Sequence, residues 1–268
     1  MTENTATRRP VAILIDLDGT LYVGKDPIPG TRQAVARLRE AGIPLRVLTN
    51  TTRKSRRDLG RRLEGMGFDF SLDEIFTAPS AAARWLERRE LKRIMPLLGR
   101  DAWEDLEGLD VVPPEEGAGP VDAVLMGDLA HDLSFDLLNR AFFALDAGAE
   151  LVACQKNRYW LSPRGLLLDA GPMVVALEYA SGKTATVVGK PSTEFFHQVF
   201  EPPGGDHSTV LMVGDDLAAD VGGAQAAGLT GVLVKTGKFR EKDIAPDAPT
   251  PDLTLDSFAD LPAALGLV

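Results

Sequence analysis

The chain has 268 residues, enough for one large domain or for a core with a second, smaller domain. Hydrophobic residues make up 44% of the chain and charged residues 25%, a balance that excludes a largely disordered protein. The formal net charge of −10 disfavours binding to nucleic acid or to an anionic membrane surface. We therefore expect neither a nucleic-acid partner nor a membrane partner.

The single cysteine, Cys154, excludes an internal disulfide bond and a zinc site made of several cysteines. The apolar run before Asp16 covers only residues 11–15, which is too short for the core of a signal peptide. No stretch approaches the roughly 18 consecutive apolar residues of a membrane-spanning helix. These features predict a cytoplasmic protein.

Strand and helix patterns alternate at the start of the chain. The apolar run 11–15 predicts a strand buried on both faces, and an amphipathic pattern predicts a helix at 31–41 that ends before Gly42. A second strand is predicted at 45–48 and a strongly charged helix at 55–66. This order is typical of parallel βαβ units.

The middle of the chain, from about 78 to 182, has an α/β pattern of its own. A helix is predicted at 134–147 with Ser134 as its N-cap, and the acidic stretch 101–119 is predicted to be rich in loops. Short apolar runs predict strands at 94–98, 123–126 and 151–153. We interpret this segment as an inserted domain.

The alternation of the first segment returns after the insertion. Strands are predicted at 184–188, 209–213 and 231–234, and helices at 193–200 and 217–227. The Pro- and Asp-rich stretch 240–252 is expected to form a surface connection. The predicted fold class is α/β: a Rossmann-like, doubly wound parallel sheet forms the core, 1–78 and 183–268, and an α/β cap domain is inserted at 79–182.

Polar side chains stand where four of the predicted strands end: Asp16, Thr49, Lys190 and Asp215. In an open parallel sheet, ligands bind at the carboxyl ends of the strands. Asp16 and Asp18 belong to the segment Asp-Leu-Asp-Gly-Thr, and two converging carboxylates repel each other unless a cation lies between them or one is protonated. The alternative is an aspartate that merely ends a strand before an Asp-Gly turn.

The other polar groups also have two interpretations each. One group is acidic: Asp215, Asp216 and Asp220. These carboxylates can cap a helix and interact favourably with its dipole, or they can supply oxygen ligands for Mg²⁺. Thr49 and Asn50 can take part in turn or capping hydrogen bonds, or they can bind phosphate oxygens. Lys190 can be a surface residue or a site residue. Their common position at strand ends favours the functional interpretation of the whole set.

These motifs resemble those of the haloacid dehalogenase superfamily: DLDGT at 16–20, TN at 49–50, Lys190 and GDDLAAD at 214–220. The resemblance covers nearly the whole chain and is to subclass IIA, whose members carry a large α/β cap between the second and third motifs. In some members the position of Asp18 is a serine, whereas the wider group of phosphatases has aspartate there, as this sequence does. The resemblance therefore implies a complete phosphatase.

The resemblance also implies roles for the site residues. Asp16 would be the nucleophile that forms an aspartyl-phosphate, and Asp18 the general acid and base. Thr49, Asn50 and Lys190 would bind the transferring phosphoryl group. A Mg²⁺ cofactor would be held by Asp16, the backbone carbonyl of Asp18 and Asp215, while Asp216 and Asp220 would orient Mg²⁺-bound waters or Lys190.

The implied substrate is a small phosphorylated metabolite, pyrophosphate or a phosphoamide. The cap would set specificity, and a homodimer through the cap is expected. Candidate specificity residues are Asp128, His131, Asp132, Arg158, Tyr159 and Trp160. The basic stretch 53–62 is interpreted as a solvated helix face or as an attractor of anionic substrates.

Two other functions are considered. One is a non-catalytic regulatory protein that binds Mg²⁺ and phosphate in the same acidic pocket. The other is a dehalogenase, against which Asp18 and the acidic group at Asp215 argue, because displacement of halide by an aspartate needs no Mg²⁺.

Overall fold

The computed structural model describes residues 9–114, 119–129, 132–162, 165–240 and 248–267. Contacts group the chain into two compact units. The first comprises Met1–Thr49, Gly60–Phe76 and Lys190–Val268, and the second comprises Asn50–Leu59 and Thr77–Gly189. The candidate specificity residue His131 lies outside the described residues.

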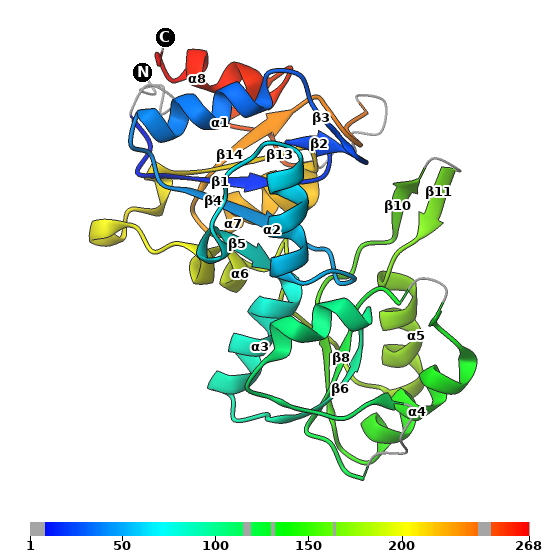
Figure 1. The fold of residues 1–268 in the computed structure, drawn as a ribbon. Coiled ribbons are helices and arrows are strands. Elements are labelled where there is room, and N and C mark those ends of the chain that lie inside the picture. The colour runs from blue at the N-terminus through cyan, green and yellow to red at the C-terminus, as the bar shows by residue number, and fades with distance from the viewer. Residues whose placement is uncertain (1–8, 115–118, 130–131, 163–164, 241–247, 268) are drawn as a thin grey trace. The chain divides into compact units, whose positions relative to one another are not determined.

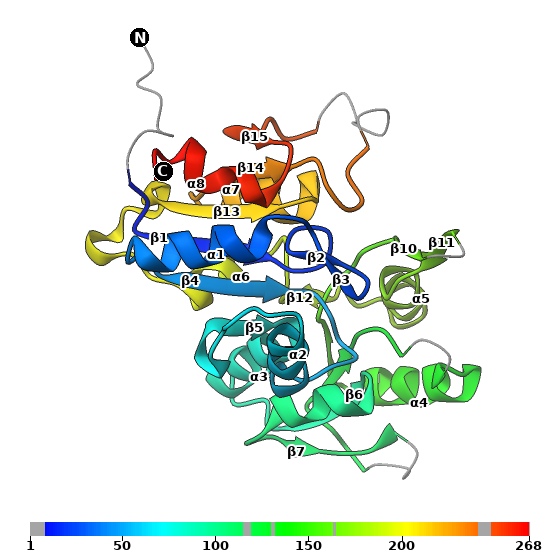
Figure 2. The same ribbon diagram turned by 45° about the horizontal axis from the view of Figure 1, so that its top comes forward.

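The first unit is built on a parallel six-stranded sheet with the order β15-β14-β13-β1-β4-β5 (Figures 1 and 2). In the central strand β1, all five residues are buried, as expected for a strand covered on both faces. Ile15 of β1 pairs with Val213 of β13 on one side and with Val47 of β4 on the other. The strands are β1 (Ala12–Asp16), β4 (Leu45–Thr49), β5 (Ile75–Thr77), β13 (Val210–Gly214), β14 (Thr230–Val234) and β15 (Leu253–Leu255).

Helices lie on both faces of this sheet: Figure 1 shows α1 and α8 above the strands and α6 below them. Helix α1 buries Ala34, Val35 and Leu38, a one-sided stripe that explains its amphipathic pattern. A small antiparallel hairpin, β2 (Tyr22–Val23) and β3 (Asp26–Pro27), follows β1. The helices are α1 (Thr31–Glu40), α2 (Arg56–Gly65), α6 (Thr193–Val199), the π-helical turn η8 (Leu217–Gly222), α7 (Gly223–Ala226) and α8 (Leu261–Ala264), and short 3-10 turns are η2 (Leu72–Glu74), η6 (Pro203–Gly205), η7 (His207–Thr209) and η10 (Phe258–Asp260).

The second unit contains a parallel five-stranded sheet with the order β12-β9-β8-β6-β7. Its strands are β6 (Arg93–Leu97), β7 (Asp110–Val111), β8 (Ala123–Met126), β9 (Glu150–Ala153) and β12 (Thr186–Val187). The sequence pattern grouped the strand at 184–188 with the core, but β12 pairs with β9 and forms one edge of the cap sheet. The predicted α/β fold with an inserted α/β cap is confirmed, and the predicted limits of the two domains stay a prediction.

The remaining elements of this unit are three helices, one 3-10 segment and a hairpin. Helix α4 is capped by Ser134, whose hydroxyl accepts a hydrogen bond of 3.2 Å from the backbone nitrogen of Leu137, as predicted. The stretch predicted as loops contains the 3-10 segment η3 besides β7. The elements are α3 (Ala78–Arg88), η3 (Arg100–Leu106), α4 (Phe135–Asp146), α5 (Gly171–Ser181) and the antiparallel pair β10 (Tyr159–Ser162) and β11 (Gly165–Leu168).

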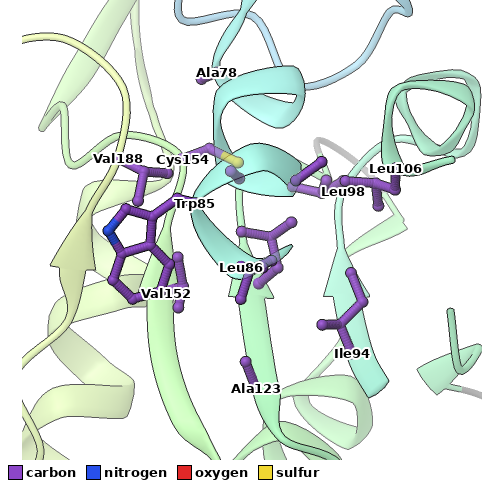
Figure 3. Close-up of a cluster of buried hydrophobic side chains, with 13 residues drawn as sticks. Ala78, Trp85, Leu86, Ile94, Leu98, Leu106, Ala123, Val152, Cys154 and Val188 are labelled. Atoms are coloured by element: carbon purple, nitrogen blue, oxygen red, sulfur yellow. The ribbon is translucent and has the colours of Figure 1, made fainter. Parts of the chain in front are cut away.

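The hydrophobic core of the cap sheet includes helix α3, which the sequence analysis did not predict. Figure 3 shows Trp85 and Leu86 of α3 among Ile94, Ala123 and Val152 of the strands. Cys154 is fully buried in the same cluster, and burial raises the pKa of its thiol. The cysteine therefore acts as a small apolar side chain.

None of the helices in the described part of the chain is both long enough and apolar enough to cross a bilayer.

Candidate active site

A buried lysine joins two of the predicted site carboxylates at the carboxyl edge of the core sheet. Lys190 Nζ lies 2.5 Å from Asp16 Oδ1 and 2.7 Å from Asp220 Oδ1. Only 3% of Lys190 is exposed. Burial opposes the charge of Lys190, but the carboxylates of Asp16 and Asp220 outweigh it and raise the pKa of the lysine. The lysine is therefore a fixed positive charge beside Asp16.

Asp215 follows β13 and lies beside two glycines that leave it room. A Cβ atom at Gly19 or at Gly237 would overlap the Asp215 carboxylate, and both glycines have positive φ values of 97° and 62°. The backbone nitrogen of Lys238 donates a hydrogen bond of 2.7 Å to Asp215 Oδ2. Burial, followed by the charge of Asp16, raises the pKa of Asp215 well above its usual range.

The acidic residues of this edge fit a divalent cation. Asp16, Asp215 and Asp220 each offer one carboxylate oxygen, and these oxygens lie within 4.8 Å of one another. A hard cation such as Mg²⁺ binds oxygen ligands and would relieve the repulsion that raises the pKa of Asp215. The donor set therefore suits Mg²⁺.

Asp220 belongs to this carboxylate group and also has protein partners on both oxygens. Oδ1 accepts from Lys190, and Oδ2 accepts from the backbone nitrogen of Asp216 at 3.1 Å. Burial raises the pKa of Asp220, and the nearby charge of Lys190 opposes that increase. These contacts favour the predicted role of Asp220 in orienting Lys190.

Asp216 is held as a helix cap. Its Oδ1 accepts hydrogen bonds of 2.9 and 3.0 Å from the backbone nitrogens of Ala218 and Ala219. Its Oδ2 lies 2.6 Å from Lys238 Nζ. Burial opposes the ionisation of Asp216, but the charge of Lys238 outweighs it and lowers the pKa of the carboxyl. Asp216 therefore holds Lys238 beside the carboxylate group.

Lys238 is a residue of this edge to which the sequence analysis gave no role. It follows β14, as the other polar residues of the edge follow their strands, and this position was the available signal. Burial opposes its charge, but Asp216 and Asp215 outweigh that effect and raise its pKa. Lys238 is thus a second positive charge at the edge.

Asp18 lies in the loop between β1 and the β2–β3 hairpin. The loop is tightened by a hydrogen bond of 2.7 Å from the backbone nitrogen of Gly19 to the carbonyl of Tyr22. The Asp18 side chain faces solvent, yet partial desolvation and the nearby Asp16 carboxylate raise its pKa. A carboxyl with a raised pKa suits the predicted role in proton transfer.

The segment that follows β4 carries Thr49 and Asn50. Thr49 is buried at the end of β4, and Asn50 belongs to the second unit. A Cβ atom at Gly189 would overlap the carbonyl oxygen of Cys154 and approach Asn50 Oδ1 to 2.7 Å. The glycine that precedes Lys190 is thus required for the close approach of Asn50, and the phosphate-binding roles of Thr49 and Asn50 stay predictions.

Much of the basic stretch 53–62 is paired with the acidic 3-10 segment η3. The distances are 2.5 Å from Lys54 Nζ to Asp101 Oδ2, 3.3 Å from Arg56 Nε to Asp105 Oδ1 and 2.5 Å from Arg57 Nε to Glu104 Oε1. Asp105 is buried and also accepts from Thr77 Oγ1 at 2.6 Å. These three basic side chains therefore bind η3.

We expect Lys190→Met to lower the free energy of unfolding of the metal-free protein by about 3–5 kcal/mol, because it leaves buried carboxylates without their partner. Urea unfolding in the presence of a chelator measures the loss. Lys235→Met is the matched control, because its ion pair with Asp256 is long, 3.5 Å, and exposed. It should cost less than about 1 kcal/mol. Equal losses in the two variants would contradict the stabilising role of Lys190.

Comparisons with known proteins show what the whole chain is similar to. Residues 13–112 match the family model of haloacid dehalogenase-like hydrolases, and residues 187–261 match a second HAD-hydrolase-like model. The chain is 43% identical to human haloacid dehalogenase-like hydrolase domain-containing protein 2, over 94% of this chain and 95% of that protein. It is 37% identical to the phospholysine phosphohistidine inorganic pyrophosphate phosphatase of Danio rerio, over 96% and 93% of the two chains.

Two solved structures are similar over most of the chain. The p-nitrophenyl phosphatase from Archaeoglobus fulgidus has a TM-score of 0.87 at 27% identity, with 96% of this chain and all of that chain covered. The glycerol phosphate phosphatase from Mycobacterium tuberculosis, in complex with magnesium, has a TM-score of 0.82 at 26% identity, with 96% and 77% covered. The chain belongs to the haloacid dehalogenase-like hydrolases, as an enzyme of the phosphatase group with a subclass IIA cap. The family predicted from the motifs is confirmed.

Proposed function

We propose that the protein is a Mg²⁺-dependent phosphohydrolase that works through an aspartyl-phosphate on a small phosphorylated metabolite, pyrophosphate or a phosphoamide. The observation that carries the proposal is the contact of Lys190 with Asp16, inside a carboxylate group that suits Mg²⁺. Relatives support the substrate classes, because their names include phosphatases of phosphoamides, pyrophosphate and glycerol phosphate.

In the proposed reaction, a carboxylate oxygen of Asp16 attacks phosphorus while the bond from phosphorus to the leaving group breaks. Asp18 gives its proton to the leaving atom, and it later takes a proton from the water that releases phosphate and restores Asp16. Lys190 orients Asp16 and, with Thr49 and Asn50, binds phosphoryl oxygens. Mg²⁺, when bound by Asp16, the backbone carbonyl of Asp18 and Asp215, supplies positive charge against the charge of the phosphoryl group.

The experiment that tests the function is phosphate release by the purified protein with Mg²⁺, with a chelator, and after Mg²⁺ is restored. We expect the chelator to lower turnover at least about 100-fold, because the charge of the metal is lost, and Mg²⁺ to restore it. The substrates are p-nitrophenyl phosphate, pyrophosphate, phosphoglycolate, phosphohistidine and phospholysine. Binding of phosphate with Mg²⁺ but no turnover of any substrate would favour the non-catalytic regulatory alternative.

The cap, predicted at 79–182, is proposed to set specificity and to form a homodimer. Exposed apolar side chains lie on two of its helices, Phe135 and Phe143 on α4 and Val175 and Tyr179 on α5. Tyr179 is 92% exposed, and α4 packs beside α5. Exposed aromatic side chains of this kind are typical of protein interfaces.

We expect Tyr179→Asp to weaken self-association at least about tenfold, because it places a charge in an apolar interface. Light scattering over a range of protein concentrations measures the dimer. Val23→Asp, which changes an exposed residue of the first unit, is the control and should leave the dimer intact. A Tyr179→Asp variant that stays dimeric, or a monomeric parent protein, would contradict this interface.

A further inference from the structure

The turn that follows β14 contacts both loops that carry the predicted Mg²⁺ ligands. It consists of residues 236–238, Thr-Gly-Lys, and is called the β14 turn below. The hydroxyl of Thr236 donates a hydrogen bond to the carbonyl of Gly19, in the loop after β1. The backbone nitrogen of Lys238 donates a hydrogen bond of 2.7 Å to Asp215 Oδ2, in the loop after β13. The β14 turn therefore connects the two loops.

The β14 turn and the loop after β1 meet at their backbones. A Cβ atom at Gly237 would lie only 2.5 Å from the Cα atom of Gly19 and 2.2 Å from Asp215 Oδ2. No side chain fits between these groups, so the close approach requires glycine at both positions. Because the packing leaves no space, a shift of the β14 turn would displace Gly19 or the Asp215 carboxylate.

Hydrogen bonds on both sides of Gly19 fix the direction of the Asp18 carbonyl, which is the predicted metal ligand. The backbone nitrogen of Gly19 donates to the carbonyl of Tyr22 at 2.7 Å, and a planar trans peptide directs the Asp18 carbonyl the opposite way. The carbonyl of Gly19 itself accepts from Thr236. Both peptide groups that flank Gly19 are therefore hydrogen-bonded, and Thr236 supplies one of the two bonds.

We propose that the β14 turn positions the ligands of Mg²⁺: Thr236 holds the Asp18 carbonyl in place, and the Lys238 backbone holds the Asp215 carboxylate. This inference rests on the Mg²⁺ site of the proposed function. Mg²⁺ requires nearly ideal octahedral coordination at short distances, whereas Ca²⁺ accepts a flexible geometry. Rigid support of two ligands therefore favours Mg²⁺ over Ca²⁺.

The test is a calorimetric titration of the metal-free protein with Mg²⁺ and, separately, with Ca²⁺. Thr236→Val keeps the shape of the side chain but removes the hydroxyl. Mg²⁺ should then bind about 10- to 100-fold more weakly, the loss typical of residues that orient a metal ligand. Ca²⁺ binding should weaken less than about threefold, because this ion tolerates displaced ligands. Equal losses for the two ions, or none for either, would overturn the positioning role.

Two further variants serve as controls. Thr236→Ser keeps the hydroxyl and should bind Mg²⁺ within about threefold of the parent protein. Thr230→Val is the matched control, because Thr230 begins the same strand and its hydroxyl donates a hydrogen bond of 2.9 Å to the carbonyl of Ser208. Thr230 pairs with Leu211 near the start of β13, whereas Asp215 follows the end of that strand, so Mg²⁺ binding should not change. Losses in either control as large as in Thr236→Val would contradict the proposal.

Metal binding and phosphate release together separate this inference from the proposed function. A protein that hydrolyses no substrate, but whose Mg²⁺ affinity falls selectively in Thr236→Val, would refute the phosphatase and support the role of the β14 turn. An active phosphatase whose Mg²⁺ affinity is unchanged in Thr236→Val would refute the role of the β14 turn alone. A parent protein that binds no Mg²⁺ would refute both.

Discussion

Asp16→Asn should lower phosphate release by roughly 10⁴- to 10⁶-fold, the loss expected when a covalent nucleophile is removed. The amide has nearly the shape of the carboxylate but cannot attack phosphorus. Lys190 keeps its contact with Asp220, 2.7 Å away, so the lysine stays paired in the variant. The substitution also removes one negative charge from a crowded acidic group, and that charge contributes to the raised pKa of Asp215. Folding should therefore survive.

Turnover with Mg²⁺ measures the loss of phosphate release, and thermal unfolding measures whether the variant is still folded. Asp136→Asn is the control, because Asp136 is exposed on α4 and pairs with Arg140 of the same helix. An acid quench during turnover should trap a phosphoryl group on a fraction of the parent protein and none on Asp16→Asn. A folded Asp16→Asn variant with more than about a tenth of parental turnover would contradict the covalent mechanism, because the amide cannot act as the nucleophile in place of the carboxylate.

The elements that could be predicted from the sequence are those with a strong local signal. The strands β1, β13 and β14 contain continuous apolar runs, and β4 is apolar except for Arg46 and Thr49, because both faces of a central parallel strand are covered. Helix α4 shows both an N-cap and a periodic apolar face. Local patterns of this kind were sufficient for the α/β class and the inserted cap.

Other elements had a weaker local signal. Helix α3 has Thr77 as its N-cap, but its first turns are buried on every side and show no polar stripe. The strands β5 and β15 have three residues each, too few to show a period. The pairing of β12 with β9 depends on contacts between segments far apart in the chain. These features are decided by tertiary packing.

Some residues of the candidate site could be predicted from the sequence, and others could not. Asp16 and Lys190 could be singled out because each ends a strand pattern, although 174 positions separate them. The ion pair of Lys238 with Asp216, and the pairing of the basic stretch with η3, could not be predicted. Such ion pairs join segments whose neighbourhood only the folded chain defines. Sequence reasoning therefore finds the residues at strand ends more readily than the charges that support them.

Asp18→Ser should slow turnover by about 10²- to 10⁴-fold, the usual contribution of a positioned acid and base. The loss should be larger for methyl phosphate than for p-nitrophenyl phosphate, because nitrophenolate leaves as a stable anion and needs little help from a proton. Metal binding should persist, since the predicted ligand at this position is the backbone carbonyl. Magnesium titration of the variant, beside turnover of both substrates, tests each part. An equal loss for the two substrates would contradict the acid role.

The pH dependence of turnover gives a second test of Asp18. Partial desolvation and the Asp16 carboxylate raise the pKa of Asp18, so its acid form persists to a higher pH than that of a free aspartate. An acid with a raised pKa is active below that pKa, and the rate falls as the pH rises through it. For methyl phosphate, the parent protein should therefore show this alkaline fall, and Asp18→Ser should lack it. A variant that keeps the parental profile would show that another group donates the proton.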